Sequence, residues 1–185
     1  MLTILHTADW HLGQQFHGYD RDYEQGCFLD WLVTELERQR PDSLIVAGDV
    51  FDSINPSAQA LRRYYRFLAG AHAALPQLQI VVTAGNHDAG ARLEAPAGVL
   101  ESLNIKVVGT VQRDALGRID VEKFLIPLKD TEGVVRAIVM AVPFLRPSDV
   151  PQVPDGDDPY LDGIRELYRQ VTAAARLMRS QQCPD

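Results

Sequence analysis

Short apolar runs alternate along this chain with longer segments in which apolar residues recur at helical spacing. Nearly continuous runs of this kind are typical of strands buried on both faces of a parallel sheet. Three of them predict the first strands: residues 2–5, 44–47 and 80–82. The resulting order of strand, helix, strand, helix, strand predicts an α/β domain.

Two helices are predicted between these strands. Residues 22–39 carry apolar side chains at the spacing of one helix face: Phe28, Trp31, Leu32 and Leu36. A second helix is expected to begin after Asn55 as its cap, with Pro56 in the first turn, where the missing N–H is tolerated. This helix carries an apolar stripe that is wider than one core-facing helix needs: Leu61, Tyr64, Tyr65, Phe67 and Leu68. The stripe either meets a partner or packs entirely inside the domain.

The second half of the chain continues with predicted strands. One is expected at residues 105–108, and two more around residue 111 and at 121–126, joined by a turn at 116–118. A longer strand is predicted at 134–142.

A loop and a last helix follow. Proline cannot continue a strand ladder, so Pro143 ends the preceding strand and residues 143–147 form a loop. Three prolines and three aspartates at 151–159 predict a loop or linker, and residues 160–178 predict an amphipathic helix. The length of the chain suits one domain over residues 1–185.

Polar side chains able to bind metal ions follow three of the predicted strands. Asp9 and His11 are two positions apart, so in extended backbone both side chains point the same way and can bind one ion. Asp49 follows Gly48, and a carboxylate can bridge two ions through its two oxygens. Asn86 offers a neutral carbonyl oxygen. The carboxyl edge of a parallel sheet is where ligands bind, so these residues are expected to converge there.

Further polar residues surround these candidates. His87 cannot easily bind the same ion as Asn86, and it is better suited to protonate a departing alkoxide or to stabilise charge on the phosphate. Asp88 can orient that imidazole, so His87 and Asp88 are our catalytic candidates. Asp52 is expected either to act behind the metal ligands or to cap a turn. Each motif alone also fits an ordinary turn, whereas the three together favour a metal site.

The mixture of carboxylate, imidazole and amide ligands favours manganese, iron, magnesium or zinc over metals that prefer thiolates. Two such ions can generate hydroxide from water, neutralise a phosphate and stabilise the leaving oxygen. The residues therefore predict hydrolysis of a phosphoester at a centre of two divalent ions.

Charge and cysteine content change this picture little. A net charge of −7 gives no global attraction to nucleic acid, although bound cations would invert the potential at the site. Cys27 and Cys183 are too few for a disulfide framework. The sequence indicates neither a signal peptide nor a membrane helix, so we expect a cytoplasmic protein without membrane contact.

The three motifs, residues 9–11, 48–52 and 85–88, resemble the calcineurin-like metallophosphoesterase family. The residues around them, together with residues 143–147, resemble the DNA nuclease subunits of that family that act with an SbcC-like ATPase. The resemblance runs from Met1 through at least Asp149. It implies a sandwich of two β-sheets flanked by helices.

For the site, the resemblance implies that Asp9 and His11 bind one metal, Asp49 bridges, Asn86 binds the second metal, and His87 is catalytic. It implies manganese as the usual cofactor and DNA ends or hairpins as substrate, in repair, recombination or replication. The implied assembly is a homodimer within a heterotetramer that contains the ATPase. Family members dimerise through helices near the active site, and the second helix supplies the candidates: Leu61, Tyr64, Tyr65 and Leu68.

The family pattern also includes three later metal-binding histidines on further strands. No histidine follows His87 in this sequence. We therefore expect a domain that lacks its C-terminal strands and an isolated chain with weak or no nuclease activity. Two alternatives stay open, namely a metallophosphodiesterase for small diesters and a non-catalytic dimerisation module.

Overall fold

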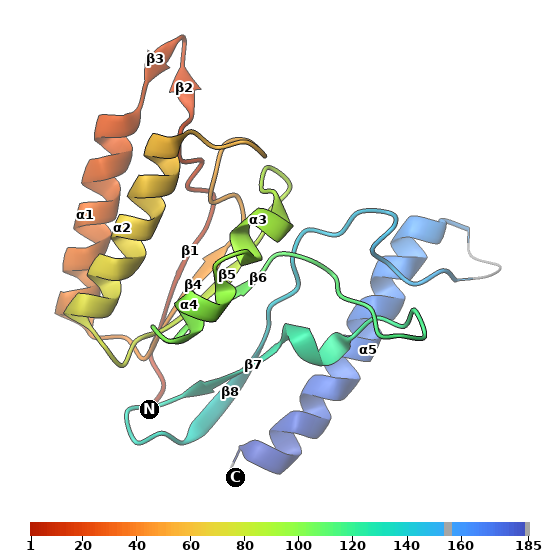
Figure 1. The fold of residues 1–185 in the computed structure, drawn as a ribbon. Helices are drawn as coiled ribbons and strands as arrows, with labels where there is room; N and C mark the ends of the chain where they lie inside the picture. Colours follow the sequence, from red (N-terminus) through yellow and green to blue (C-terminus); the bar gives the residue numbers. More distant parts are fainter. Residues whose placement is uncertain (154–156, 184–185) are drawn as a thin grey trace.

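Four parallel strands form the central sheet of the computed structural model, which describes residues 1–153 and 157–183 (Figure 1). Neighbouring strands bond in the order β1 (Ile4–Thr7), β4 (Ser43–Ala47), β5 (Gln79–Thr83) and β6 (Ile105–Val108). The predicted strands are thus confirmed, although the first begins two residues later than expected. Because all four run the same way, their carboxyl ends meet at one edge, the upper edge in Figure 1.

One face of this sheet is covered by α1 (Asp22–Gln39) and α2 (Ala58–Ala74) (Figure 1). The larger hydrophobic core lies between them, where Leu44 and Ile80 of the sheet meet Leu36 of α1. The bounds of α1 are those predicted. The short helices α3 (Gly90–Glu94) and α4 (Ala97–Glu101) contact β6 on the same side.

The start of α2 differs from the prediction. Ser57, not Asn55, caps the helix, and its hydroxyl accepts a hydrogen bond from the Ala60 N–H at 3.1 Å. Ser57 has the extended backbone that a cap requires, and Pro56 precedes it rather than lying in the first turn. Serine and asparagine are comparable caps, so the sequence did not distinguish them.

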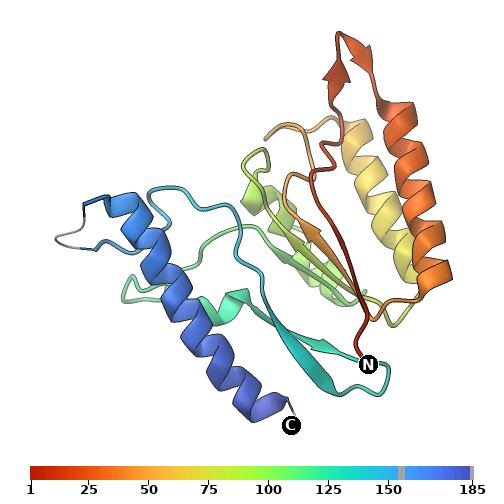
Figure 2. The same cartoon turned by 180° about the vertical axis from the view of Figure 1, so that it is seen from behind.

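The other face of the sheet is covered by an antiparallel pair and a long helix (Figure 2). The pair consists of β7 (Leu125–Lys129) and β8 (Val135–Met140), and α5 (Pro159–Gln182) packs on β8. A second core joins Val81 of the sheet to these elements. The two sheets with helices outside agree with the α/β sandwich that the sequence predicted.

The remaining predictions need small corrections. Residues 121–124 form the short helix η1 (Val121–Phe124), so the strand predicted at 121–126 begins only at Leu125, and residue 111 lies outside a strand. The turn at 116–118 is present, closed by a bridge between Arg113 and Ile119. The hairpin of β2 (Gln15–Phe16) and β3 (Tyr19–Asp20) was not predicted.

Residues 154–156 of the loop predicted at 151–159 lie outside the described residues. The helix that follows begins at Pro159, one position earlier than expected, because Asp158 caps it. None of the helices in the described ranges is long and apolar enough to span a membrane. A single domain over residues 1–185 stays a prediction.

The second face of the sheet is covered unevenly. Val81 of β5 is buried and Ile45 of β4 is partly buried, whereas Ile4 of β1 is 42% exposed. Ala47 and His6, on the same side as Ile45 and Ile4, are also exposed. Among the described residues, β7, β8 and α5 therefore shield the β5 side of this face and leave the β1 side open.

Candidate metal centre

Two loops run side by side at the carboxyl edge of the sheet. The Asp9 N–H donates to the Gly48 carbonyl at 3.1 Å, and the His11 N–H donates to the Asp49 carbonyl at 2.9 Å. Asp9, His11 and Asp49 have φ angles of 57°, 45° and 48°, in the left-handed region that side chains other than glycine rarely adopt. Backbone strain of this kind is concentrated at functional sites, because the surrounding structure must hold it in place.

Three side chains form a group able to hold a metal ion. One ligand atom from each of His11, Asp49 and His87 lies within 4.8 Å of the others. The His11 Nε2 is 3.7 Å from Asp49 Oδ2, and the two imidazole rings meet edge to face at 4.8 Å between centroids. The other oxygen of Asp49 accepts the His87 backbone N–H at 3.0 Å. Asp49 is therefore fixed between the two histidines.

Asp9 and Asn86 complete the set of residues predicted from the sequence. Both are exposed, and both line a hollow of about 490 Å³ that Asp49 also lines. The hollow extends from the strand ends to Tyr160 and Tyr168 of α5. The structure thus brings all the predicted metal ligands to one edge of the sheet.

Asp52 lies beside both histidines. Its carbonyl oxygen is 2.8 Å from His87 Nδ1, and because a carbonyl only accepts, this nitrogen must carry the proton. This contact, and then the charges of nearby aspartates, raise the pKa of His87 above its usual value. The Asp52 carboxylate is 3.3 Å from His11 Nδ1. Asp52 thus lies beside both histidines, and its role behind the metal ligands stays a prediction.

The Asp88 carboxylate does not contact the His87 ring in this structure, contrary to our expectation. It accepts three backbone N–H groups, from Val50 at 3.1 Å, Phe51 at 2.9 Å and Gly85 at 2.9 Å. Asp88 is only 1% exposed, and burial raises the pKa of its carboxyl against the opposing effect of these donors. Asp88 therefore holds the loops after β4 and β5 together, and Asp52 takes the orienting place beside His87.

Gln25 is a supporting residue that the sequence reasoning missed. Its amide donates to the His11 carbonyl at 2.7 Å and accepts the Gly13 N–H at 3.0 Å, so α1 positions the loop that carries His11. Gln25 is buried on the same helix as Leu29 and Leu32. A glutamine at a core-facing position of a predicted helix was the signal that could have revealed it.

The residues at this edge fit divalent metal ions. Their donor atoms are carboxylate and amide oxygens and imidazole nitrogens, the set that suits manganese, iron, magnesium or zinc. The polar neighbour of the buried His11 Nδ1 is the Asp52 carboxylate at 3.3 Å, so His11 Nε2, on the Asp49 side, is the nitrogen placed to bind an ion.

The apolar stripe of α2 mostly faces the core. Tyr64 and Leu68 are 0% and 1% exposed and pack, with Phe67, under the sheet. Leu61 and Tyr65 are partly buried against the same cluster. Tyr64 and Leu68 therefore cannot contact a partner in this conformation, and the alternative that the stripe packs inside the domain holds for them.

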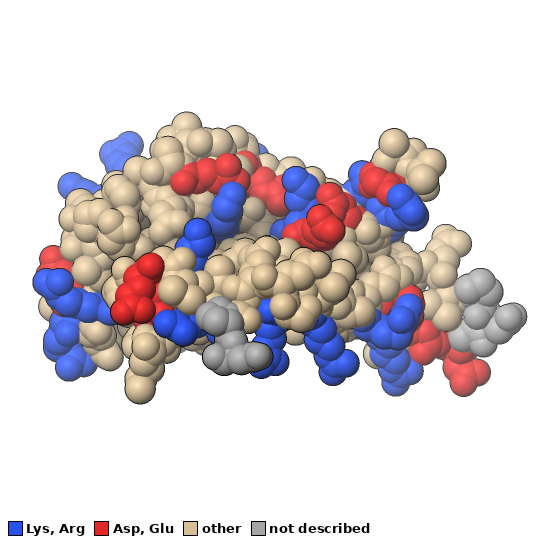
Figure 3. All heavy atoms as spheres, turned by 90° about the horizontal axis from the view of Figure 1, so that it is seen from below, with Lys and Arg blue, Asp and Glu red and all other residues tan. Residues whose placement is uncertain are grey.

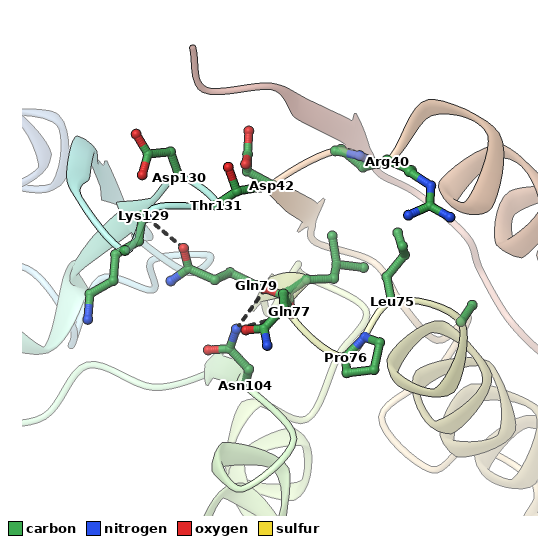
Figure 4. Close-up of a pocket in the computed structure, with 14 residues that line it drawn as sticks. Arg40, Asp42, Leu75, Pro76, Gln77, Gln79, Asn104, Lys129, Asp130 and Thr131 are labelled. Carbon is green, nitrogen blue, oxygen red and sulfur yellow. Dashed lines mark hydrogen bonds between the residues drawn. The ribbon is translucent and has the colours of Figure 1, made fainter.

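A separate cavity of about 490 Å³ lies at the opposite end of the sheet (Figure 4). Gln79 links the two sheets there, since its side chain accepts the Lys129 N–H at 2.6 Å and donates to the Pro127 carbonyl at 3.2 Å. Positive and negative side chains are intermixed on the face seen in Figure 3, which is viewed from this end. The cavity is remote from the metal-binding candidates.

Comparison with known proteins agrees with this geometry. The family model of calcineurin-like phosphoesterases matches residues 2–149. The chain therefore belongs to the calcineurin-like phosphoesterase family, whose members are metal-dependent.

Its named relatives are components of the SbcCD nuclease. The chain is 46% identical over 180 residues to the D subunit of the SbcCD nuclease of Rhodobacter capsulatus, covering 97% of this chain and 43% of that protein. It is 34% identical over 192 residues to the protein of the same name from Escherichia coli K12, and the match covers 98% of this chain and 44% of that protein. The Bacillus subtilis protein of that name is 41% identical over 108 residues, which cover 58% of this chain and 27% of that protein. The chain spans less than half the length of these curated relatives.

Proposed function

We propose that this chain carries the catalytic residues of a DNA nuclease that hydrolyses phosphodiester bonds with two divalent ions, most readily manganese. The observation that carries the proposal is the group of His11, Asp49 and His87 at the carboxyl edge of the sheet, with ligand atoms within 4.8 Å. Asp9 and Asn86 line the adjoining hollow. The relatives named as nuclease subunits support DNA as the substrate.

In this proposal Asp9 and His11 hold one ion, Asn86 holds the second, and Asp49 contacts both. Bound ions supply hydroxide near neutral pH and neutralise the phosphate. His87 donates a proton to the leaving oxygen. Its Nδ1 is engaged by the Asp52 carbonyl, which leaves Nε2 for this transfer.

The assembly is also part of the proposal. The relatives are each named as one component of a nuclease called SbcCD, which supports an SbcC-like ATPase as partner. We propose that two copies of this protein form a homodimer within a heterotetramer that contains the ATPase. This assembly acts in the cytoplasm on DNA ends and hairpins during repair or recombination. Leu61 and Tyr65 are the members of the α2 stripe that keep some exposure for such a contact.

We propose that the 185-residue chain turns over slowly. The described residues place two imidazoles, His11 and His87, at the site, and in this proposal only His11 serves as a metal ligand. Removal of even a supporting partner commonly weakens a metal site about 10- to 100-fold, so a sparse set of direct ligands weakens it at least as much.

Cleavage of labelled single-stranded and hairpin DNA, with and without manganese, tests the proposal. We expect slow, manganese-dependent cleavage that His87→Ala reduces roughly 100-fold or more. His17→Ala is the matched control, because His17 is exposed on the β2–β3 turn. Cleavage that persists in EDTA, or that is equally fast in His87→Ala, would contradict the proposed chemistry. Fast turnover by the unmodified chain would contradict only the proposal that the 185-residue chain cleaves DNA slowly.

Two comparisons separate the alternatives. A higher rate on bis(4-nitrophenyl) phosphate than on DNA favours a small-molecule diesterase. Dimerisation in sedimentation, without manganese binding in calorimetry, favours a non-catalytic module.

A further inference from the structure

The loop after β8 presents two side chains outward in a regular pattern. Pro143 and Leu145 are buried, whereas Phe144 and Arg146 are exposed, Phe144 to 47%. Alternate residues of an extended segment point to opposite sides. The loop therefore directs the Phe144 ring and the Arg146 guanidinium toward solvent on the same side, two positions apart in the sequence. In Figure 1 this segment rises from β8 toward the upper edge of the sheet.

The backbone of this loop is fixed by its surroundings. Three hydrogen bonds join this segment to other parts of the structure: Phe144 N–H to the Ala84 carbonyl at 2.8 Å, Tyr160 hydroxyl to the Leu145 carbonyl at 2.6 Å, and Arg113 to the Ser148 carbonyl at 3.1 Å. A fourth, from the Arg146 N–H to Asp149 Oδ2 at 2.8 Å, lies within the segment. A surface held in this way loses little conformational freedom when a ligand binds.

Phe144 separates two hollows. The first is the one of about 490 Å³ that Asp49 and Asn86 line. The second, of about 380 Å³, is lined by Ile54 and Arg146 and by segments around residues 90 and 110. Phe144 lines both hollows, and Arg146 lines the second. A polymer that extends from the metal-binding candidates through the first hollow into the second therefore passes the Phe144 ring and then reaches Arg146.

The Arg146 guanidinium at the second hollow is available to an anion. In the part of the chain that the structure describes, no hydrogen bond or ion pair engages the Arg146 guanidinium. Arg92 bonds only the neutral Asn55 side chain, and the Arg113 guanidinium bonds only carbonyl groups. The nearby acids do not pair with these guanidiniums, since Glu94 accepts from Gly109 and Thr110, and Asp149 accepts from the backbone of the loop itself. Among the described residues, the Arg146 guanidinium thus has no carboxylate paired with it and is available to an anion, although the chain carries −7.

We propose that Phe144 and Arg146 bind the DNA strand beside the scissile phosphate, Phe144 by stacking on a nucleobase and Arg146 by contacting a phosphate. An exposed ring next to a free guanidinium matches the alternation of base and phosphate along a single strand. An apolar protein segment would leave the Arg146 guanidinium without a counterpart. The proposal rests on the proposed nuclease function and assigns a substrate-binding role to the loop at residues 143–147.

Anisotropy of a labelled 15-nucleotide poly-dT strand, measured in EDTA so that no cleavage occurs, tests this role. We expect Phe144→Ala and Phe144→Leu to weaken binding roughly 5- to 150-fold, the range for loss of one base–aromatic stack, and Phe144→Tyr to retain it. Arg146→Ala should reduce the slope of log affinity against log salt by about 1. Phe16→Ala and Arg176→Ala, which alter an exposed ring and an exposed arginine elsewhere, should change affinity less than twofold.

Photocrosslinking provides an independent readout. A strand carrying 5-iodouracil should crosslink to Phe144, identified by mass spectrometry of the peptide. Affinity within twofold of the unmodified chain for Phe144→Ala, or crosslinks confined to other aromatic residues, would overturn the proposal. Equal loss in Phe144→Tyr and Phe144→Ala would also overturn it, because the ring would then not be the determinant.

The proposed function can fail separately. Manganese-dependent hydrolysis of bis(4-nitrophenyl) phosphate together with unaffected DNA binding by the Phe144 variants rejects the strand-binding role and keeps the phosphodiesterase chemistry. Absence of both hydrolysis and DNA binding in the unmodified chain rejects both proposals. Tight binding of a protein partner, but not of DNA, at this loop rejects the strand-binding role.

Discussion

Gly85 approaches Asp49 so closely that a methyl group on its Cα would stand 2.0 Å from Asp49 Oδ1 and 2.3 Å from the Asp49 backbone nitrogen. Both obstacles are fixed, since Oδ1 accepts the His87 N–H. We expect Gly85→Ala to displace the carboxylate and to weaken manganese binding at least 10-fold in titration calorimetry.

Gly98→Ala is the control for that substitution. Nothing lies within 4 Å of a methyl group at Gly98, which is on the short helix α4. Manganese affinity should stay within twofold there. An equal loss in both variants would show that the close approach at Gly85 does not determine the metal site.

Asp88→Asn should destabilise the fold and the site together. An amide offers one acceptor oxygen and two donors in place of a carboxylate that now accepts three backbone N–H groups. Leaving buried donors unpaired costs about 1–3 kcal/mol, measurable by urea unfolding. Asp30→Asn, on an exposed residue of α1, should change the free energy of unfolding by less than about 0.5 kcal/mol. A stable Asp88→Asn chain would contradict the structural role.

The ion pair between Asp22 and Arg63 should make stability depend on pH. The Arg63 guanidinium lowers the pKa of the Asp22 carboxyl in the folded chain below its usual 3.8. The stabilisation is therefore complete above the unfolded pKa and is lost as the pH falls through the folded one. Both side chains are about a quarter exposed, so the effect should stay below about 1 kcal/mol.

Urea unfolding between pH 7 and pH 3 checks this expectation. At pH 7 the Asp22→Asn chain should have a lower free energy of unfolding than the unmodified chain. Toward pH 3 the two free energies of unfolding should converge. Glu24→Gln, in the same turn of α1, controls for the change in net charge. A difference between Asp22→Asn and the unmodified chain that grows as the pH falls would have the wrong sign.

Leu68→Ala tests whether the α2 stripe belongs to the core. Leu68 is 1% exposed, and truncation of a buried leucine costs about 2–5 kcal/mol. Leu177→Ala, at a position 60% exposed on α5, should cost less than about 0.5 kcal/mol. Sedimentation of the same variants separates the alternatives, because a dimer lost by Leu68→Ala without loss of stability would place this residue in an interface.

Strands and the first helix could be predicted because burial leaves a repeating mark on the sequence. Continuous apolar runs located β4 and β5 to within one residue, and helical spacing located α1. The β2–β3 hairpin left no such mark, since its strands have two residues each and both its aromatic side chains, Phe16 and Tyr19, are exposed. Gly18, with a φ of 80°, was its only turn signal.

The metal-binding candidates could be predicted because strand ends in a parallel sheet share one edge. The roles of Asp52 and Asp88 could not, since both act through backbone groups, the Asp52 carbonyl and the Val50, Phe51 and Gly85 amides. The identity of a side chain reveals neither the role of Asp52 nor that of Asp88. Which of the two aspartates meets the His87 imidazole depends on the conformation of the two loops, and here it is Asp52, through its carbonyl oxygen.

The three bonds of Asp88 also couple folding to metal concentration. Two of them, from Phe51 and Val50, join residues 37 and 38 positions apart in sequence, so the donors at the site can gather only when β4 and β5 are paired. An ion that binds only this arrangement stabilises it by about 2.7 kcal/mol at 100 times its dissociation constant. The melting temperature should therefore rise with manganese, and its dependence on concentration reports the affinity of the site even where no substrate is turned over.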